Sequence, residues 1–235
     1  MNEYSSRWEY LKNRSPWHFD KQAEPTADWS ILGRFVGDWQ QELAQVIRSA
    51  NGGSPLNFLN KLKTQKKPYT YSLDKTDMST MGLPDDAVFL YRILAPDLNP
   101  LDCPKLFKMI DWFGLEDVLP KIHIQHPGQI FPLHIDDLTT HRGNQKDNTV
   151  MDEHPEQWAR FEIQLKDWTW GHVWGIGNDY WKQWSAGDIM YHPWWIHPHG
   201  TANFGMEPRI NLQLTGRVTE RTLECLAKNH GDIPI

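Results

Sequence analysis

The chain has 235 residues, a net charge of −6 at pH 7 and only two cysteines. This length suits one domain, or one domain with a sizeable extension. The acidic balance argues against nucleic acid as a partner, the apolar runs are too short to span a membrane, and two cysteines without a CxxC pair argue against a disulfide framework.

The first part of the chain predicts an arm, a helix and surface loops. Residues 1–27 are polar with scattered aromatic side chains, which indicates an extended arm. Apolar residues then recur at helical spacing over 31–50, and the Asn-Gly-Gly at 51–53 would end an amphipathic helix there. Residues 54–86 are rich in Lys, Thr, Ser and Pro, as surface loops are. We therefore expect residues 1–86 to form an N-terminal arm and helical region that packs on a core.

The remainder of the chain predicts that core, followed by a short helix and tail at 219–235. A buried strand at 87–94 and a short helix at 105–116 come first. Eight strand-like segments then follow with turns but no helices between them, at 121–126, 131–137, 149–152, 160–166, 171–176, 187–191, 195–203 and 209–215. Such a series indicates an antiparallel sandwich or barrel.

A His-x-Asp pair lies on the second of these segments, where residues 131–137 read FPLHIDD. Side chains two positions apart on a strand lie on the same face, so His134 and Asp136 would point the same way. An imidazole beside a carboxylate is two thirds of a facial triad, which holds iron(II) and leaves coordination positions open. The pair alone is a weak signal, and it predicts a metal site only if a further histidine joins it.

Candidates for that histidine stand near the far end of the chain, in the segment 194–209. His197 and His199 compete for the position, and His192 is a weaker candidate. Arg209 begins the last predicted strand, and an arginine fork can hold a buried carboxylate through two parallel charge-assisted hydrogen bonds.

These residues together resemble the iron(II)- and 2-oxoglutarate-dependent oxygenases. That family carries His-x-Asp on the second core strand, a distal His on the seventh, and on the eighth an Arg or Lys that binds the far carboxylate of 2-oxoglutarate. In this chain the second segment holds His134 and Asp136, the seventh His199 and the eighth Arg209. The Asn203 that follows His199 also matches the family's distal pattern, which favours His199 over its neighbour.

The resemblance implies a mainly β fold with flanking helices. Residues 87–218 would form a double-stranded β-helix core of the jelly-roll or cupin type, preceded by an α-rich N-terminal region. The implied cofactors are Fe(II) and 2-oxoglutarate, with O2 as cosubstrate. The implied metal ligands, which are also the catalytic residues, are His134, Asp136 and His199. The implied anchor for the far carboxylate of the cosubstrate is Arg209. Many relatives have a Ser or Thr two residues after this arginine, where this chain has Asn211. Asn211, Gln125 and Arg160 are the further cosubstrate-binding candidates, because they would lie on the inner face of their strands.

The implied activity is hydroxylation of an unactivated C–H bond, with release of succinate and CO2. The substrate would be a small molecule or an amino-acid or peptide side chain. Asp136 favours hydroxylation, because halogenases of the superfamily have a small residue there, whereas desaturation or ring formation stays open. The N-terminus has no apolar signal region, so we expect a cytoplasmic protein. The oligomeric state stays open.

Two other classes of protein remain open from the residues. A non-oxygenase metallo-cupin, such as an isomerase, would use His197 and His199 as an HxH pair. Cupins of that type need a Glu a few residues on, and Glu207 is too far by that pattern. A metal-free sandwich that binds a ligand through aromatic residues would leave the coincidence of ligand types unexplained.

Overall fold

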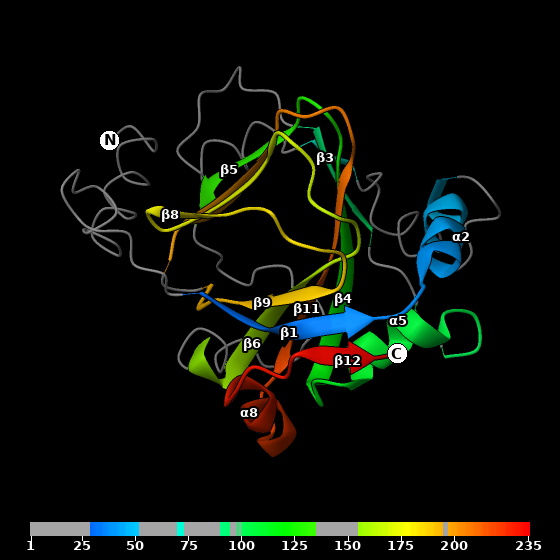
Figure 1. The fold of residues 1–235 in the computed structure, drawn as a ribbon, viewed down its shortest axis with the longest axis vertical. Coiled ribbons are helices and arrows are strands. Elements are labelled where there is room, and N and C mark those ends of the chain that lie inside the picture. Colours follow the sequence, from blue (N-terminus) through cyan, green and yellow to red (C-terminus); the bar gives the residue numbers. More distant parts are fainter. Residues whose placement is uncertain are drawn as a thin grey trace.

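The computed structural model describes residues 29–51, 70–72, 90–94, 98, 100–134, 155–194 and 197–235. Two β-sheets face each other, and helices α2 and α5 lie on the outer side of the larger sheet (Figure 1). The elements in chain order are β1 (Ser30–Val36), α2 (Gln40–Asn51), β2 (Thr70–Ser72), β3 (Leu90–Leu94), α5 (Pro104–Asp111), β4 (Glu116–Gln125), β5 (Ile130–His134), the 3-10 turn η2 (Pro155–Gln157), β6 (Trp158–Gln164), β7 (His172–Ile176), β8 (Asp179–Trp181), β9 (Asp188–Tyr191), β10 (His199–Asn203), β11 (Arg209–Arg217), α8 (Glu220–Leu226) and β12 (Asp232–Pro234).

The strand order of the two sheets is that of a double-stranded β-helix. The larger sheet runs β12-β1-β9-β6-β11-β4-β3-β2, and the smaller runs β5-β10-β7-β8. Counted from β4 to β11, the first, third, sixth and eighth strands lie in the larger sheet. The second, fourth, fifth and seventh lie in the smaller one. The predicted jelly-roll core is thus confirmed by its strand connections.

The larger sheet has one apolar and one polar face, because side chains alternate along each strand. Its outer face packs on α2 and α5 through a single buried cluster. That cluster includes Leu43, Val46, Leu106, Met109, Ile122, Ile124, Phe161, Ile163, Leu212 and Leu214. The alternate side chains of β4, β6 and β11 therefore face the smaller sheet, and most of them are polar.

The prediction of a helix over 31–50 is wrong for residues 31–36, which form a strand. Residues Ser30–Val36 form β1, which pairs antiparallel with β9 and parallel with β12 (Figure 1). The close approach of the two backbones requires glycine at position 33, since a Cβ there would lie 2.8 Å from the main-chain oxygen of Gly231. The helix starts only at Gln40, whose main-chain N–H donates to the Asp38 carboxylate.

Other predicted elements match more closely. The predicted helix at 105–116 corresponds to α5, which ends five residues earlier at Asp111, and the helix predicted after 218 is α8. The short strand β8 was not predicted, and the weak strand expected at 149–152 lies outside the described residues. The division of the chain at residues 86 and 218 stays a prediction, although β1 and β12 join the same sheet as β4.

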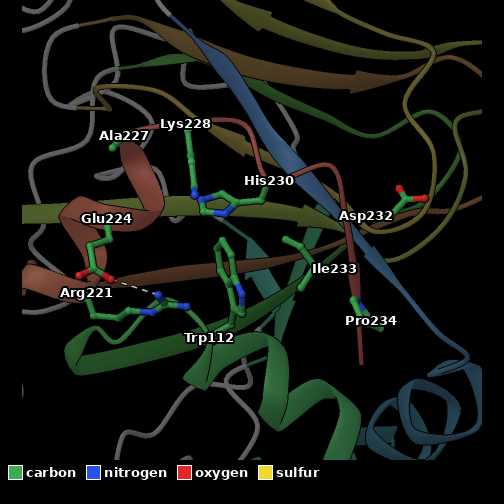
Figure 2. A pocket seen from close by; sticks show the side chains of 9 residues that line it. All are labelled: Trp112, Arg221, Glu224, Ala227, Lys228, His230, Asp232, Ile233 and Pro234. Carbon is green, nitrogen blue, oxygen red and sulfur yellow. Dashed lines mark hydrogen bonds and ion pairs between the residues drawn. The ribbon is translucent and has the colours of Figure 1, made fainter.

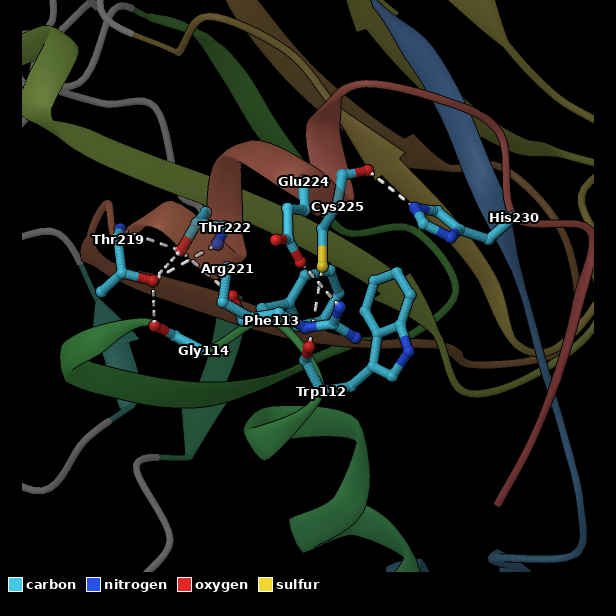
Figure 3. Close-up of polar contacts among 9 residues, drawn as sticks. All are labelled: Trp112, Phe113, Gly114, Thr219, Arg221, Thr222, Glu224, Cys225 and His230. Carbon is cyan, nitrogen blue, oxygen red and sulfur yellow. Dashed lines mark hydrogen bonds and ion pairs between the residues drawn. The ribbon is translucent and has the colours of Figure 1, made fainter.

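The C-terminal helix is fixed to the end of α5 by hydroxyl groups. Thr219 is the N-cap of α8, and its hydroxyl donates to the main-chain oxygen of Gly114 at 2.7 Å. The buried Thr222 hydroxyl donates to the main-chain oxygen of Phe113 at 3.0 Å (Figure 3). Nearby, α8, β12 and Trp112 line a surface hollow of about 540 Å³ (Figure 2). None of these residues belongs to the polar face between the sheets.

Two further expectations concern cysteines and membranes. Cys103 and Cys225 are both buried free thiols, in agreement with the lack of a disulfide framework. No helix within the described ranges is both long and apolar enough to cross a membrane.

Candidate metal centre

The smaller sheet brings two of the predicted ligand positions together. His199, the first residue of β10, is the direct Cα partner of His134, the last residue of β5. Directly opposed positions of an antiparallel pair share one face of the sheet, and their Cβ atoms lie about 5 Å apart. The strand register thus matches what a shared metal ion would require of these two positions.

His199 is buried, with 7% of its surface exposed. Its Nδ1 atom lies 3.1 Å from the main-chain oxygen of His197. A proton on Nδ1 there would leave the lone pair on Nε2, the arrangement common in metal-binding histidines. His197 itself is buried, and the ring of His192 lies edge-on to that of His199 with centroids 4.8 Å apart. The three competing histidines are therefore close neighbours.

The third predicted ligand, Asp136, lies outside the described residues. Within the described part of the chain, no three His, Cys, Asp or Glu side chains form a group that could hold a metal ion. Glu207, which the HxH alternative would need, is exposed in the turn between β10 and β11. The main-chain oxygen of Glu207 accepts hydrogen bonds from Asn203 and His172, so these two side chains fix the turn.

Arg209 is held inside the barrel by neutral oxygen atoms. It is 1% exposed, and its Nε donates to Gln125 Oε1 at 2.9 Å. Its Nη1 donates to Asn211 Oδ1 at 3.0 Å and its Nη2 to Thr201 Oγ1 at 3.3 Å. The guanidinium carbon also lies 4.7 Å from the ring centre of Trp174. The structure thus brings the predicted Gln125 and Asn211 to Arg209.

Sequence reasoning missed two partners of this arginine. Thr201 lies two residues after His199, and its hydroxyl also accepts from Gln125 Nε2 at 3.1 Å. The alternation of side chains along β10 could have predicted that Thr201 lies in the site, because residues 199 and 201 share a face of the strand. Trp174 lies opposite Thr201 in the ladder of β7 and β10, a pairing that only the sheet register reveals.

Arg160 was also predicted to bind the cosubstrate, but it lies far from Arg209, whereas Gln125 and Asn211 contact Arg209. It is the Cα partner of Thr215 on β11, and its Nε donates to Thr215 Oγ1 at 2.9 Å. Positions 209 and 215 of β11 are six residues apart, about 20 Å of strand. Arg160 packs instead over the ring of Trp194 at 5.0 Å.

Two more charged side chains join Arg160 on the inner face. Glu162 is 1% exposed and accepts from Asn211 Nδ2 at 2.6 Å and from Gln213 Nε2 at 2.8 Å. Burial raises the pKa of its carboxyl group to about 7, against the opposing effects of those hydrogen bonds and of the cations. Lys121 is the Cα partner of Gln213, and burial lowers the pKa of its amine to about 7.

Among the described residues, several buried polar side-chain atoms in the interior have no hydrogen-bond partner. Gln164 is 0% exposed, and neither atom of its amide has a hydrogen-bond partner. The Nε1 atom of Trp174 is likewise buried without a partner. Buried polar groups without partners are costly, and both residues lie next to partners of Arg209. A polar ligand beside Arg209 would satisfy them, and two imidazoles with one carboxylate suit iron(II).

Solved structures resemble this chain over part or most of its length. A prolyl-4-hydroxylase from Pseudomonas putida is 12% identical with a TM-score of 0.45, and the match covers 82% of this chain and 93% of that one. A double-stranded β-helix protein from Klebsiella pneumoniae is 22% identical with a TM-score of 0.27, over 43% and 69%. A sugar phosphate isomerase from Silicibacter pomeroyi is 13% identical with a TM-score of 0.30, over 45% of this chain and 54% of its own length.

No family model matches the chain. No curated protein matches it either. The assignment of the fold rests on the strand order of the two sheets.

Proposed function

We propose that the protein is an iron(II)- and 2-oxoglutarate-dependent dioxygenase that hydroxylates a C–H bond of a small molecule or an amino-acid or peptide side chain. One observation carries the proposal. His199 opposes His134 in the ladder of β10 and β5, and two residues further along β10 the Thr201 hydroxyl contacts the buried Arg209. Two proposed ligand positions on paired strands thus lie close in sequence to a hydroxyl group that contacts a buried cation.

Each residue has a defined task in this proposal. His134, Asp136 and His199 would hold the metal, and Arg209 would bind the far carboxylate of 2-oxoglutarate. Gln125, Asn211 and Thr201 hold the guanidinium group in place through neutral acceptors, and the guanidinium group would form charge-assisted hydrogen bonds with that carboxylate. When bound, iron(II), 2-oxoglutarate and O2 would supply the oxidation R–H + 2-oxoglutarate + O2 → R–OH + succinate + CO2.

The barrel contributes enclosure as well as ligands. Trp174 and Trp194 are both buried, at 3% and 1% exposure, against Arg209 and Arg160. Aromatic walls keep water from the charged groups, and electrostatic attraction is stronger in such an enclosed site. A dicarboxylate would therefore be bound more firmly by Arg209 here than at a solvated surface.

The choice of histidine can be tested by metal binding. His199→Ala should remove iron(II) binding, while the neighbouring His197→Ala, the matched control, should retain it. Iron content after anaerobic loading and desalting measures both. Loss of iron in the His197 variant with retention in the His199 variant would show that the distal ligand is His197.

The activity can be tested by succinate release. Wild-type protein with iron(II), 2-oxoglutarate and air should release one succinate per oxidised product when pools of small molecules are supplied, and none without O2. Metal binding without 2-oxoglutarate turnover would favour the metallo-cupin alternative. Folded protein that binds no metal would favour a ligand-binding sandwich.

A further inference from the structure

Gln164 is a buried amide on the inner face of the larger sheet. It is the last residue of β6 and follows Ile163, which packs in the outer apolar cluster, so the alternation along the strand turns Gln164 toward the smaller sheet. Its side chain is 0% exposed, and neither atom of its amide has a hydrogen-bond partner among the described residues. Native proteins rarely leave a buried amide without partners, so Gln164 indicates a place where a further polar group binds.

The register of the sheet places this amide close to Arg209. Gln164 is the Cα partner of Asn211, which lies two residues after Arg209 on the same face of β11. The main-chain N–H of Leu165 donates to the oxygen of Ile210 at 2.9 Å, so β6 and β11 stay joined beyond Gln164. Diagonal positions of an antiparallel pair lie about 7–8 Å apart, a gap that two long side chains can close around a small group.

Asn211 is occupied by other partners, although it lies opposite Gln164. Its Oδ1 atom accepts from Arg209 Nη1 at 3.0 Å, and its Nδ2 atom donates to Glu162 Oε2 at 2.6 Å. The asparagine therefore joins the arginine to the carboxylate of Glu162. The amide of Gln164 stays outside this chain of hydrogen bonds.

An indole of the smaller sheet borders the same region. The guanidinium carbon of Arg209 lies 4.7 Å from the ring centre of Trp174, which is 3% exposed. The Nε1 atom of Trp174 is buried and has no hydrogen-bond partner within the described ranges. Trp174 packs in an apolar cluster with Met190, which is the Cα partner of Glu162 on β6. Apolar surroundings make each unsatisfied donor costly, and a bound acceptor would remove that cost.

We propose that Gln164 donates a hydrogen bond from Nε2 to the far carboxylate of the cosubstrate, and so helps Arg209 to select a dicarboxylic α-keto acid over one with an apolar end. This inference rests on the proposed function, in which Arg209 anchors 2-oxoglutarate. The indole N–H of Trp174 is a second neutral donor beside that carboxylate. A carboxylate only accepts hydrogen bonds, so Gln164 Oε1 would accept from a water molecule bound with it.

Two α-keto acids that differ only at the far end test this role. They are 2-oxoglutarate and 2-oxopentanoate, in which a methyl group replaces the far carboxylate. Calorimetric titration of the full-length protein, loaded with iron(II) and kept without O2, measures both affinities. Gln164→Met keeps the length of the side chain and removes its polar atoms. It should weaken 2-oxoglutarate binding about tenfold, since a hydrogen bond to a charged group is lost, and leave 2-oxopentanoate binding unchanged.

Two further variants locate the effect. Gln183→Met, at an exposed glutamine, is the matched control and should bind both ligands as the wild type does. Adding Gln164→Met to Arg209→Ala should weaken 2-oxoglutarate binding further, because the proposed hydrogen bond reaches the carboxylate directly. An amide that only positioned the arginine would cause no further loss in that background.

The melting temperature gives a readout that needs no ligand. Because Gln164→Met removes buried polar atoms that have no partners, the ligand-free variant should melt at a higher temperature than the wild type. The rise in melting temperature on adding 2-oxoglutarate should be smaller in the variant, since the ligand binds it more weakly. A lower melting temperature of the ligand-free variant would show that the amide already has a partner, such as a buried water, and would overturn the inference.

Three binding results would also overturn it. They are unchanged 2-oxoglutarate affinity in Gln164→Met, equal losses for 2-oxoglutarate and 2-oxopentanoate, and no further loss when Gln164→Met is added to Arg209→Ala. Failure of the iron-loaded wild type to bind 2-oxoglutarate would instead contradict the proposed function.

Discussion

Arg209 and Gln125 are Cα partners on β11 and β4, and a 2.9 Å hydrogen bond joins Arg209 Nε to Gln125 Oε1. The amide of Gln125 also donates to the main-chain oxygen and the hydroxyl of Thr201. One glutamine thus connects the buried cation in the larger sheet to β10 in the smaller one. This link fixes where a carboxylate could meet the arginine.

Replacing Arg209 should remove the cosubstrate while sparing the metal. Arg209→Ala should weaken 2-oxoglutarate binding by about 2–5 kcal/mol, because a buried carboxylate loses its countercharge, and should retain iron(II). Calorimetry and iron analysis measure the two effects. Arg217→Ala, an exposed arginine on the same strand, is the control and should change neither. Unaltered 2-oxoglutarate affinity in Arg209→Ala would exclude Arg209 as the anchor.

Replacing Gln125 should have a smaller effect of the same kind. Gln125→Ala removes the acceptor of Arg209 Nε and lets the guanidinium group move, so 2-oxoglutarate affinity should fall by about 1 kcal/mol. Titration of the variant with 2-oxoglutarate measures this. A loss as large as that of Arg209→Ala would mean that Gln125 touches the cosubstrate itself.

The placement of several of these residues on the strands was predictable from the sequence, because it depends on the alternation of side chains along a strand and on the number of strands. The positions of His199 and Arg209 on the seventh and eighth strands follow from turn residues and alternation, and so does the shared face of Arg209 and Asn211. Trp174 was not predictable as a partner of Arg209, because its place depends on the register between separate strands.

The strand β1 was not predicted, for a related reason. Its apolar residues Leu32 and Phe35 are three apart, which suits a helix as well as a strand. The strand forms because β9 and β12 supply hydrogen-bond partners on both sides, and that information lies about 150 to 200 residues away in the chain.

Glu162 should make stability depend on pH. Burial raises the pKa of the folded-state carboxyl group to about 7 from its usual value near 4.5, so the native state binds more protons than the unfolded state between these values. The stability that Glu162 contributes is therefore full below about pH 4.5 and falls as pH rises to 7, by on the order of 3 kcal/mol.

Glu162→Gln isolates this effect. The free energy of unfolding of the wild type minus that of the variant should decrease between pH 4.5 and 7 and then stay level. Urea titrations at several pH values, without metal, measure the difference. Lys121→Met serves as the comparison, because the lowered pKa of Lys121 makes its charged form destabilising below pH 7 and relieves the penalty as pH rises above 7. A pH-independent difference for Glu162→Gln would contradict the raised pKa.

The hydrogen bonds between α8 and the residues that follow α5 should affect the stability of the protein and not its binding of 2-oxoglutarate. Thr222→Val keeps the shape of the buried side chain but leaves the Phe113 main-chain oxygen without its donor (Figure 3). It should cost about 1–3 kcal/mol of unfolding free energy and leave 2-oxoglutarate affinity unchanged. Leu223→Ala, at the adjacent exposed position, should cost much less. Equal losses in the two variants would show that the hydroxyl contact contributes nothing.

The most direct test of the proposed function is an anaerobic titration of iron(II)-loaded protein with 2-oxoglutarate, followed by visible absorption. Chelation of iron(II) by an α-keto acid produces a metal-to-ligand charge-transfer band. We expect the band to appear in the wild type and in His197→Ala and to saturate at one 2-oxoglutarate per iron. It should be missing in His199→Ala, which lacks the metal, and should require far more 2-oxoglutarate in Arg209→Ala. A folded, iron-loaded wild-type protein that shows no band would contradict the oxygenase assignment.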